Sequence, residues 1–244
     1  MQERRKKVLK AVVKEYQRTG QPVASLDLAK RWNFGFSPAT VRAEMLTLDK
    51  EGFLEQPHTS AGRLPTDKAF RFFIEEFGEE ELGQSEREQV LEQMRKLHNE
   101  SMGEMAQFLA DCSRGLGLFG TFGRMSDWHG HSSHKATDWR SSGLKWLAEE
   151  PEFEDNDLKN IMKCFDSLEE DFNKFFNDIE ETEIYVGREN PIKYLRNYSL
   201  VVTGFENEDG RGVLGILGPK RMNYQKNKFV VEETRKRVSK QAKK

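Results

Sequence analysis

The sequence has little cysteine, little proline and no long apolar run. Its 244 residues include 2 cysteines, Cys112 and Cys164, and 7 prolines. Two cysteines so far apart do not make a disulfide framework, which favours a reducing compartment. No stretch approaches the roughly 20 apolar residues of a membrane span, and no apolar run of signal-peptide length follows the basic N-terminus. We therefore expect a soluble, cytoplasmic protein.

Patterns that carry chemistry are also lacking. No Ser/His/Asp order, carboxylate pair or metal-ligand spacing stands in a convincing context. The glycine-rich run at 115–123 lacks the strand and helix that flank a phosphate-binding loop. Three histidines, His129, His131 and His134, offer imidazoles to zinc, but exposed His-rich loops are more common and no further ligand is clearly placed. We expect no enzyme, no cofactor and no metal.

Charge is plentiful but unevenly distributed. Residues 1–74 carry a net charge of +6, residues 75–183 carry -16 and residues 184–244 carry +8, which together give the overall -2. A basic N-terminal block fits a polyanionic partner. The acidic middle argues against nucleic acid wrapping that part of the chain.

Residues 36–66 predict a helix followed by a two-stranded hairpin. Ser37 is a good N-cap and Pro38 fits the first helical position. One apolar stripe follows at helical spacing, formed by Val41, Met45 and Leu48. Gly52 suits the left-handed position that ends a helix. The other face of the first two turns carries short side chains and one guanidinium group. Its residues are Ala39, Thr40, Arg42 and Ala43.

Two amphipathic helices precede this stretch, at about 4–19 and at 26–31, where Ser25 is the expected cap. A fourth helix should begin at Thr66 or Asp67. Helix, helix, tight turn, helix and hairpin is the order of a winged helix-turn-helix. The loop 58–63 would then hold Arg63 out as a probe of a DNA groove. The alternative is an ordinary helix and hairpin in a core.

Sequence patterns in the rest of the chain predict further helices and strands. A linker at 78–84 leads to a capping box at Ser85 and Glu88, which opens one long helix to about residue 114. That helix packs either on a partner chain or on its own domain. Residues 115–142 show no clear periodicity. A helix from Asp155 or Asn156 carries an apolar stripe, read as core or as part of a dimer seam. Strands at 182–186, 199–205 and 212–217 and a basic C-terminal helix follow.

Several motifs make the chain resemble the HrcA family of bacterial heat-inducible transcription repressors. They are QPVAS at 21–25, SPATVR at 37–42, QPHTSAGRLPTD at 56–67, GLKWLAEEPEF at 143–153, VGREN at 186–190, YSLVVTGF at 198–205 and GILGPKRMNY at 215–224. The resemblance implies an α+β fold. A winged-helix DNA-binding domain at 1–77 and a linker at 78–84 would precede a GAF-like sensor and dimerisation domain at 85–244, shortened around 115–142.

The same resemblance implies partners and contact residues. The protein would repress chaperonin and chaperone operons, bind an inverted-repeat operator as a homodimer, depend on a GroE-type chaperonin and lose activity on heat stress. The alternative is a small-molecule-sensing regulator with a GAF-like pocket. Residues facing the major groove would be Ser37, Ala39, Thr40, Arg42 and Ala43. The wing, near the DNA backbone or the minor groove, would consist of His58, Thr59, Ser60 and Arg63.

Basic residues at the start of the chain are further candidates. Arg4, Arg5 and Lys6 are expected either to touch phosphate or to form a solvated helix end. Glu44 is an awkward neighbour for DNA. Its carboxylate either orients Arg42, rejects wrong bases or faces water.

Overall fold

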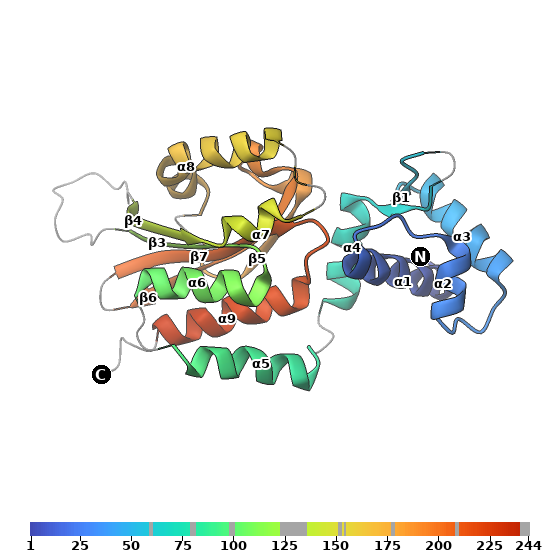
Figure 1. The fold of residues 1–244 in the computed structure, drawn as a ribbon, viewed down its shortest axis with the longest axis horizontal. Coiled ribbons are helices and arrows are strands. Elements are labelled where there is room, and N and C mark those ends of the chain that lie inside the picture. Colours follow the sequence, from blue (N-terminus) through green and yellow to red (C-terminus); the bar gives the residue numbers. More distant parts are fainter. Residues whose placement is uncertain are drawn as a thin grey trace. The chain divides into compact units, whose positions relative to one another are not determined.

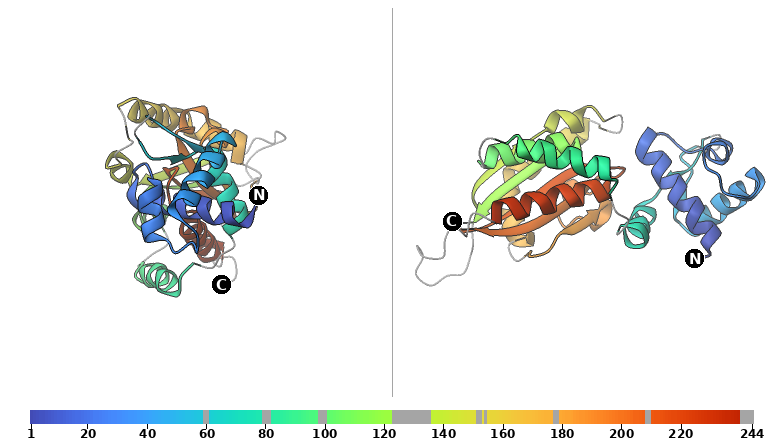
Figure 2. Two further views of the ribbon diagram at one scale, coloured as in Figure 1. Left: turned by 90° about the vertical axis from the view of Figure 1, so that its right-hand side faces the viewer. Right: turned by 90° about the horizontal axis from the view of Figure 1, so that it is seen from below.

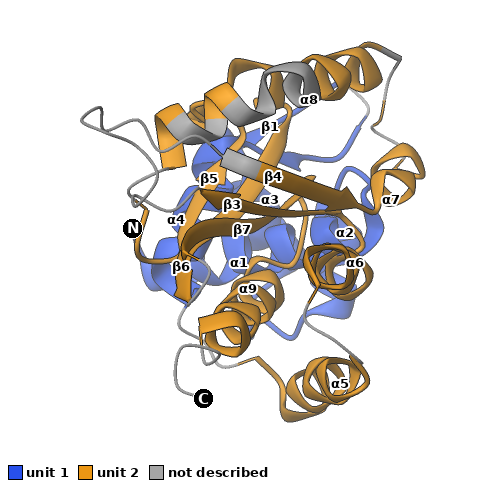
Figure 3. Ribbon diagram, turned by 90° about the vertical axis from the view of Figure 1, so that its left-hand side faces the viewer, with its two compact units in different colours: residues 1–80 blue, residues 81–244 orange. Residues whose placement is uncertain are grey.

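The computed structural model of the chain (Figure 1) describes residues 1–58, 61–78, 82–97, 101–122, 136–150, 153, 155–176, 179–207 and 210–239. The chain divides into two compact units, residues 1–80 and 81–244, which are coloured separately in Figure 3. The boundary falls within the segment expected to be a linker, although Gln84 already belongs to a helix. None of the described helices is long and apolar enough to cross a membrane.

Unit 1 consists of helices and a short antiparallel hairpin. In chain order its described elements are α1 (Glu3–Thr19), α2 (Ser25–Arg31), α3 (Pro38–Lys50), β1 (Leu54–Glu55), β2 (Leu64–Pro65) and α4 (Asp67–Phe77). Helix α1 lies at the centre of the unit and contacts α2, α3 and α4. The core contains the buried stripe of α1 and apolar side chains of its neighbours, namely Val8, Leu9, Val12, Val13, Leu28, Val41, Leu48, Phe70 and Phe73.

Local sequence signals explain most of these boundaries. The N–H of Gly20, at φ 65°, donates to the carbonyl of Tyr16 and ends α1. Gly52, at φ 76°, follows α3 in the left-handed conformation, as predicted. Thr66 caps α4 by accepting from the backbone N–H of Ala69. The predicted cap at Ser25 is wrong, because Ser25 is itself helical and no side chain caps α2.

Unit 2 is a five-stranded antiparallel sheet covered by helices. Its described elements are α5 (Gln84–Arg95), α6 (Met102–Ser113), β3 (Leu116–Phe122), β4 (Ala136–Ser142), α7 (Leu144–Ala148), α8 (Asp155–Phe176), β5 (Glu183–Val186), the short 3-10 turns η2 (Gly187–Glu189) and η3 (Lys193–Leu195), β6 (Tyr198–Asn207), β7 (Gly210–Pro219) and α9 (Tyr224–Ser239). The strand order is β4-β3-β7-β6-β5. Helices α6 and α9 lie against one face of the sheet, and α7 and α8 lie against the other (Figure 2).

The region between 115 and 142 differs from its sequence-based description. Residues 116–122 and 136–142 form the hairpin β3–β4, with Gly120 opposite Trp139. Most of β3 is buried, because helices cover both of its faces, so the alternation that identifies an exposed strand is missing. A Cβ at Gly117 would lie 2.1 Å from the carbonyl oxygen of Ala106, so α6 can pack this closely only on glycine. The histidines 129, 131 and 134 lie outside the described residues.

The single long helix expected from 85 to 114 is wrong. The structure has two helices, α5 and α6, and Ser101 is the N-cap of the second rather than a polar position within one helix. Its hydroxyl oxygen accepts from the N–H of Glu104 at 3.3 Å. The expected capping box is absent from α5, which begins after Gly83 without a side-chain cap.

Helix α8 begins at Asp155, as predicted, but its apolar stripe is only partly core. Ile161 and Phe176 are buried, whereas Leu158, Met162 and Phe175 are exposed. The side chains of Phe165, Leu168 and Phe172 lie outside the described set. The predicted strands near 182–186, 199–205 and 212–217 are confirmed as β5, β6 and β7.

Candidate nucleic-acid interface

The outward face of α3 is a narrow stripe without acidic residues. Counting from the first member, its residues fall at positions i, i+3, i+4, i+7 and i+11, and all are exposed: Ala39, Arg42, Ala43, Leu46 and Lys50. The opposite face packs into unit 1 through Val41, Met45 and Leu48. Because the side chains of Ala39 and Ala43 are short, a ligand can approach the first two turns of α3 closely. Arg42 and Lys50 supply positive charge on the same face.

The first turn of α3 is fixed by Ser37 and Thr40. The side-chain oxygen of Ser37 accepts from the backbone N–H of Thr40 at 3.2 Å, as predicted for an N-cap. The two hydroxyl oxygens also lie 3.0 Å apart. Ser37 is exposed and Thr40 half-buried, so these hydroxyls stand at the start of the exposed stripe.

Glu44 points away from this stripe. It is 5% exposed, and its carboxylate accepts from Nε of Arg4 at 2.7 Å and from Nε of Arg5 at 3.2 Å. Burial raises the pKa of Glu44, but hydrogen bonds and charge from the two guanidinium groups outweigh it, so the pKa lies below its usual value. Glu44 therefore neither orients Arg42, nor faces the bases, nor faces water, which were the three expectations. Its carboxylate instead holds the start of α1 against α3.

The three basic residues at the start of α1 therefore differ. Arg5 is 19% exposed and also donates through Nη1 to Glu51 at 2.6 Å. Lys6 binds Glu76 of α4, and this hydrogen bond raises the pKa of the Lys6 ammonium. Arg4 keeps 51% of its side chain exposed, with its guanidinium 6.0 Å from the ring centroid of Phe36. Arg4 is thus the most exposed of the three side chains.

Arg63 does not project from the loop, contrary to expectation. Its side chain is 12% exposed, and Nε lies 2.8 Å from Oδ2 of Asp49, without the alignment of a hydrogen bond. The backbone of Arg63 forms a bridge with Val23 through two hydrogen bonds of 2.9 Å. A Cβ at Gly62 would lie 2.5 Å from the carbonyl carbon of Val23, so only glycine fits there. The base of the hairpin is therefore fixed to the α1–α2 loop and to α3.

The hairpin loop beyond this base is held by short-range hydrogen bonds. The side-chain amide of Gln56 donates to the carbonyl of Ala61 at 2.9 Å, and the N–H of Ala61 donates to the carbonyl of His58. His58 is exposed. Thr59 and Ser60, also expected to contact DNA, lie outside the described residues.

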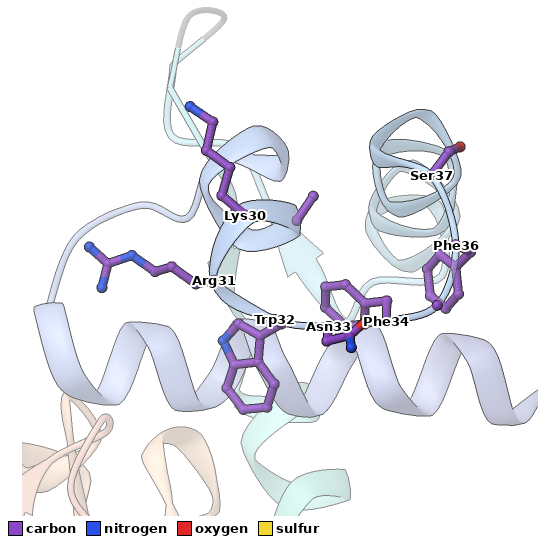
Figure 4. A pocket seen from close by; sticks show the side chains of 9 residues that line it. Lys30, Arg31, Trp32, Asn33, Phe34, Phe36 and Ser37 are labelled. Atoms are coloured by element: carbon purple, nitrogen blue, oxygen red, sulfur yellow. The ribbon is translucent and has the colours of Figure 1, made fainter.

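The turn between α2 and α3 carries three aromatic rings (Figure 4). Trp32 and Phe34 have ring centroids 6.5 Å apart, and Phe34 and Phe36 have centroids 5.2 Å apart, both in stacked orientations. The surrounding open pocket, of about 670 Å³, is lined by consecutive residues 29–37. Because Phe36 directly precedes the N-cap, the stack helps to set where α3 begins.

Unit 2 has a smaller cavity of about 260 Å³ near Phe153 and Lys220. Its two carboxylates are engaged within the chain: Glu150 binds Arg221, and Asp157 accepts from Asn197 at 2.9 Å. Among the described residues, no group of three His, Cys, Asp or Glu side chains could hold a metal ion. The interface on unit 1 is therefore the stronger candidate site.

Comparison with known proteins identifies the family. The family model "HrcA protein C terminal domain" matches residues 67–227. The chain belongs to the HrcA family. A member from Moorella thermoacetica (strain ATCC 39073 / JCM 9320), "Heat-inducible transcription repressor HrcA", is 45% identical over 115 residues, covering 47% of this chain and 32% of that protein. The match to Natranaerobius thermophilus (strain ATCC BAA-1301 / DSM 18059 / JW/NM-WN-LF) covers 31% of its relative, so the chain aligns with about a third of these two HrcA proteins.

A third HrcA relative matches along nearly its whole length. The protein from Thermodesulfovibrio yellowstonii (strain ATCC 51303 / DSM 11347 / YP87) is 27% identical over 333 positions, covering 93% of each chain. Because the alignment is longer than the 244 residues of this chain, the relative contains sequence that this HrcA-family member lacks. A crystal structure described as a hypothetical protein at 2.2 Å resolution has the same fold, with a TM-score of 0.74, 20% identity and coverage of 99% and 97%.

Two positions on the exposed stripe, Leu46 and Lys50, were not predicted from the sequence, and neither were the ion pairs beneath the stripe. Leu46 and Lys50 continue the periodicity of Ala39, Arg42 and Ala43, so the signal was present in the spacing. The pairs of Glu44 with Arg4 and of Asp49 with Arg63 join residues far apart in sequence. No local pattern indicates them.

Proposed function

We propose that this chain is a DNA-binding transcription repressor and that unit 1 is its winged helix-turn-helix domain. The observation that carries the proposal is the exposed, acid-free stripe of α3, with Arg42 at its centre and small residues around it. The HrcA names of the relatives support the same function. Helix α3 is the recognition helix, and the hairpin β1–β2 with its loop is the wing.

The mechanism is an equilibrium of binding, without bond chemistry. Ala39 and Ala43 let the helix approach the base edges in the major groove, and Arg42 donates in a bidentate manner to guanine. Ser37, Thr40 and Arg4 position the helix by contacts to phosphate or sugar. The loop tip with His58, Thr59 and Ser60 meets the neighbouring backbone. Arg5, Lys6 and Arg63 act within the domain, through their carboxylate partners.

Unit 2 serves as a GAF-like dimerisation and sensor domain. Its antiparallel sheet with helices on both faces supports this assignment. A homodimer presents two recognition helices to an inverted-repeat operator of chaperonin or chaperone genes. A GroE-type chaperonin keeps unit 2 folded, so that heat or unfolded protein lowers the folded, binding-competent population. No observation on the 260 Å³ cavity favours small-molecule sensing instead.

The test is selection from a random-sequence DNA duplex library with the purified chain, in the presence of a GroE-type chaperonin. The proposal predicts that the bound pool converges on an inverted repeat, and that two chains bind each duplex in sedimentation analysis. A pool that remains random after repeated rounds would rule out the repressor function. Convergence on a single half-site, bound by one chain, would remove the dimer and leave the DNA-binding assignment intact.

A further inference from the structure

Leu46 is the one large apolar side chain on the exposed stripe of α3, whose other members are two alanines and two cations. It is 43% exposed in the third turn of α3, while the apolar residues on the other side of the same helix are buried. Its neighbours along the stripe are Arg42, four residues before, and Lys50, four residues after, both exposed. Leu46 is therefore not one of the buried core residues of unit 1.

The surroundings of Leu46 restrict what can cover it. No stripe position is acidic, and the carboxylate of Asp49, on the flank of α3, is paired with Arg63. The hydroxyl of Thr47 donates to the carbonyl of Ala43 at 3.1 Å and is therefore turned back onto its own helix. An apolar group between two cations fits a polyanion that also presents apolar groups. In the major groove of DNA, that group is the 5-methyl of thymine.

We propose that Leu46 is a specificity-determining residue that contacts a thymine methyl group in the major groove. This proposal rests on the function proposed above, with α3 as the recognition helix. Arg42 and Leu46 lie one helical turn apart, so they read neighbouring base pairs, one by hydrogen bonding and the other by apolar contact. The favoured site therefore contains a thymine next to the position that Arg42 reads.

The experiment uses the duplex selected by the wild-type protein, synthesised with dU in place of one dT at a time. This change removes the methyl group and leaves base pairing intact. Wild-type protein is expected to bind about 4-fold more weakly at one dT position, the equivalent of burying about one methyl group, roughly 0.8 kcal/mol. Leu46→Ala should bind the dT and dU duplexes equally well at that position.

A matched control is Leu26→Ala, since Leu26 is exposed by 64% on α2, in the same unit. It should respond to dU as the wild type does. Thermal unfolding and sedimentation show whether Leu46→Ala keeps its stability and oligomeric state. If no dT position distinguishes wild type from Leu46→Ala, the inference is overturned. It is also overturned if Leu46→Ala weakens selected and scrambled duplexes equally, or changes the oligomeric state.

These outcomes separate the inference from the function on which it rests. A wild-type protein that selects no sequence contradicts the repressor function itself. A wild-type protein that selects an inverted repeat, yet tolerates every dU substitution, contradicts only the role of Leu46.

Discussion

The guanidinium of Arg63 lies 2.8 Å from the carboxylate of Asp49 and joins the base of the hairpin to the last turn of α3. The pair neutralises the carboxylate of Asp49, which lies on the flank of the exposed stripe and has a side chain 33% exposed. In the proposed function, Arg63 would thereby assist DNA binding without contacting the DNA.

Replacing Arg63 with Ala should weaken binding to every DNA sequence, because Asp49 then presents an unpaired negative charge beside α3. The further change Asp49→Asn should restore affinity, since the charge is gone. The measurement is anisotropy with selected and scrambled duplexes for the wild type, the single variant and the double variant. If Arg63 contacts phosphate directly, the second substitution restores nothing.

Gly62→Ala should destabilise unit 1 by about 1–3 kcal/mol, because the added methyl group would lie 2.5 Å from the backbone of Val23. Urea unfolding followed by circular dichroism measures the change. Gly103→Ala is the matched control. Nothing lies within 4 Å of a Cβ at Gly103, which sits in α6, so alanine there should be neutral or slightly stabilising. Equal effects of the two substitutions would argue against a close approach at Gly62.

Glu44→Gln should lower stability at neutral pH by about 1–2 kcal/mol, because two guanidinium groups lose their charged acceptor. The folded-state pKa of Glu44 is lowered, so its contribution is fully present above the unfolded-state pKa and is lost as pH falls through the folded-state value. The difference between wild type and Glu44→Gln should therefore be constant near neutral pH. It should shrink as pH falls below the ordinary glutamate value of 4.5.

Urea unfolding of both proteins across this pH range provides the check. A difference that persists unchanged into strong acid would show that the carboxylate charge is not what holds Arg4 and Arg5. In that case the loss would come from packing alone.

Most of unit 1 could be predicted because its signals are local. The stripe of α1, the cap at Ser37 and the left-handed Gly52 each depend on a few neighbouring residues, and all are confirmed. Ion pairs such as Glu44 with Arg4 depend on the tertiary fold, so the sequence left three interpretations of Glu44 open. The ion pair of Arg63 also depends on the tertiary fold. The charge of Arg63 suggested a contact with DNA, but its partner is Asp49, fourteen residues earlier in the sequence.

Unit 2 was harder to predict for two physical reasons. Ser101 fits both the polar side of a continuous helix and the N-cap of a new one, and the local sequence does not distinguish these two roles. Strand β3 is covered on both faces and has glycines where α6 approaches, at Gly117, and where Trp139 packs, at Gly120. It therefore shows neither alternation nor high β-propensity. Strands β6 and β7 were recognisable because their apolar runs flank a turn sequence.

The most direct test of the central claim, that the exposed face of α3 reads DNA, is the affinity of Arg42→Ala for the selected inverted repeat and for a scrambled duplex. Arg95→Ala, which removes an exposed arginine from unit 2, is the matched control. We predict that Arg42→Ala loses about 1–3 kcal/mol of binding free energy on the selected duplex, with little change on the scrambled one. Arg95→Ala should behave as the wild type. Equal losses for Arg42→Ala on both duplexes, or no loss on either, would contradict the account.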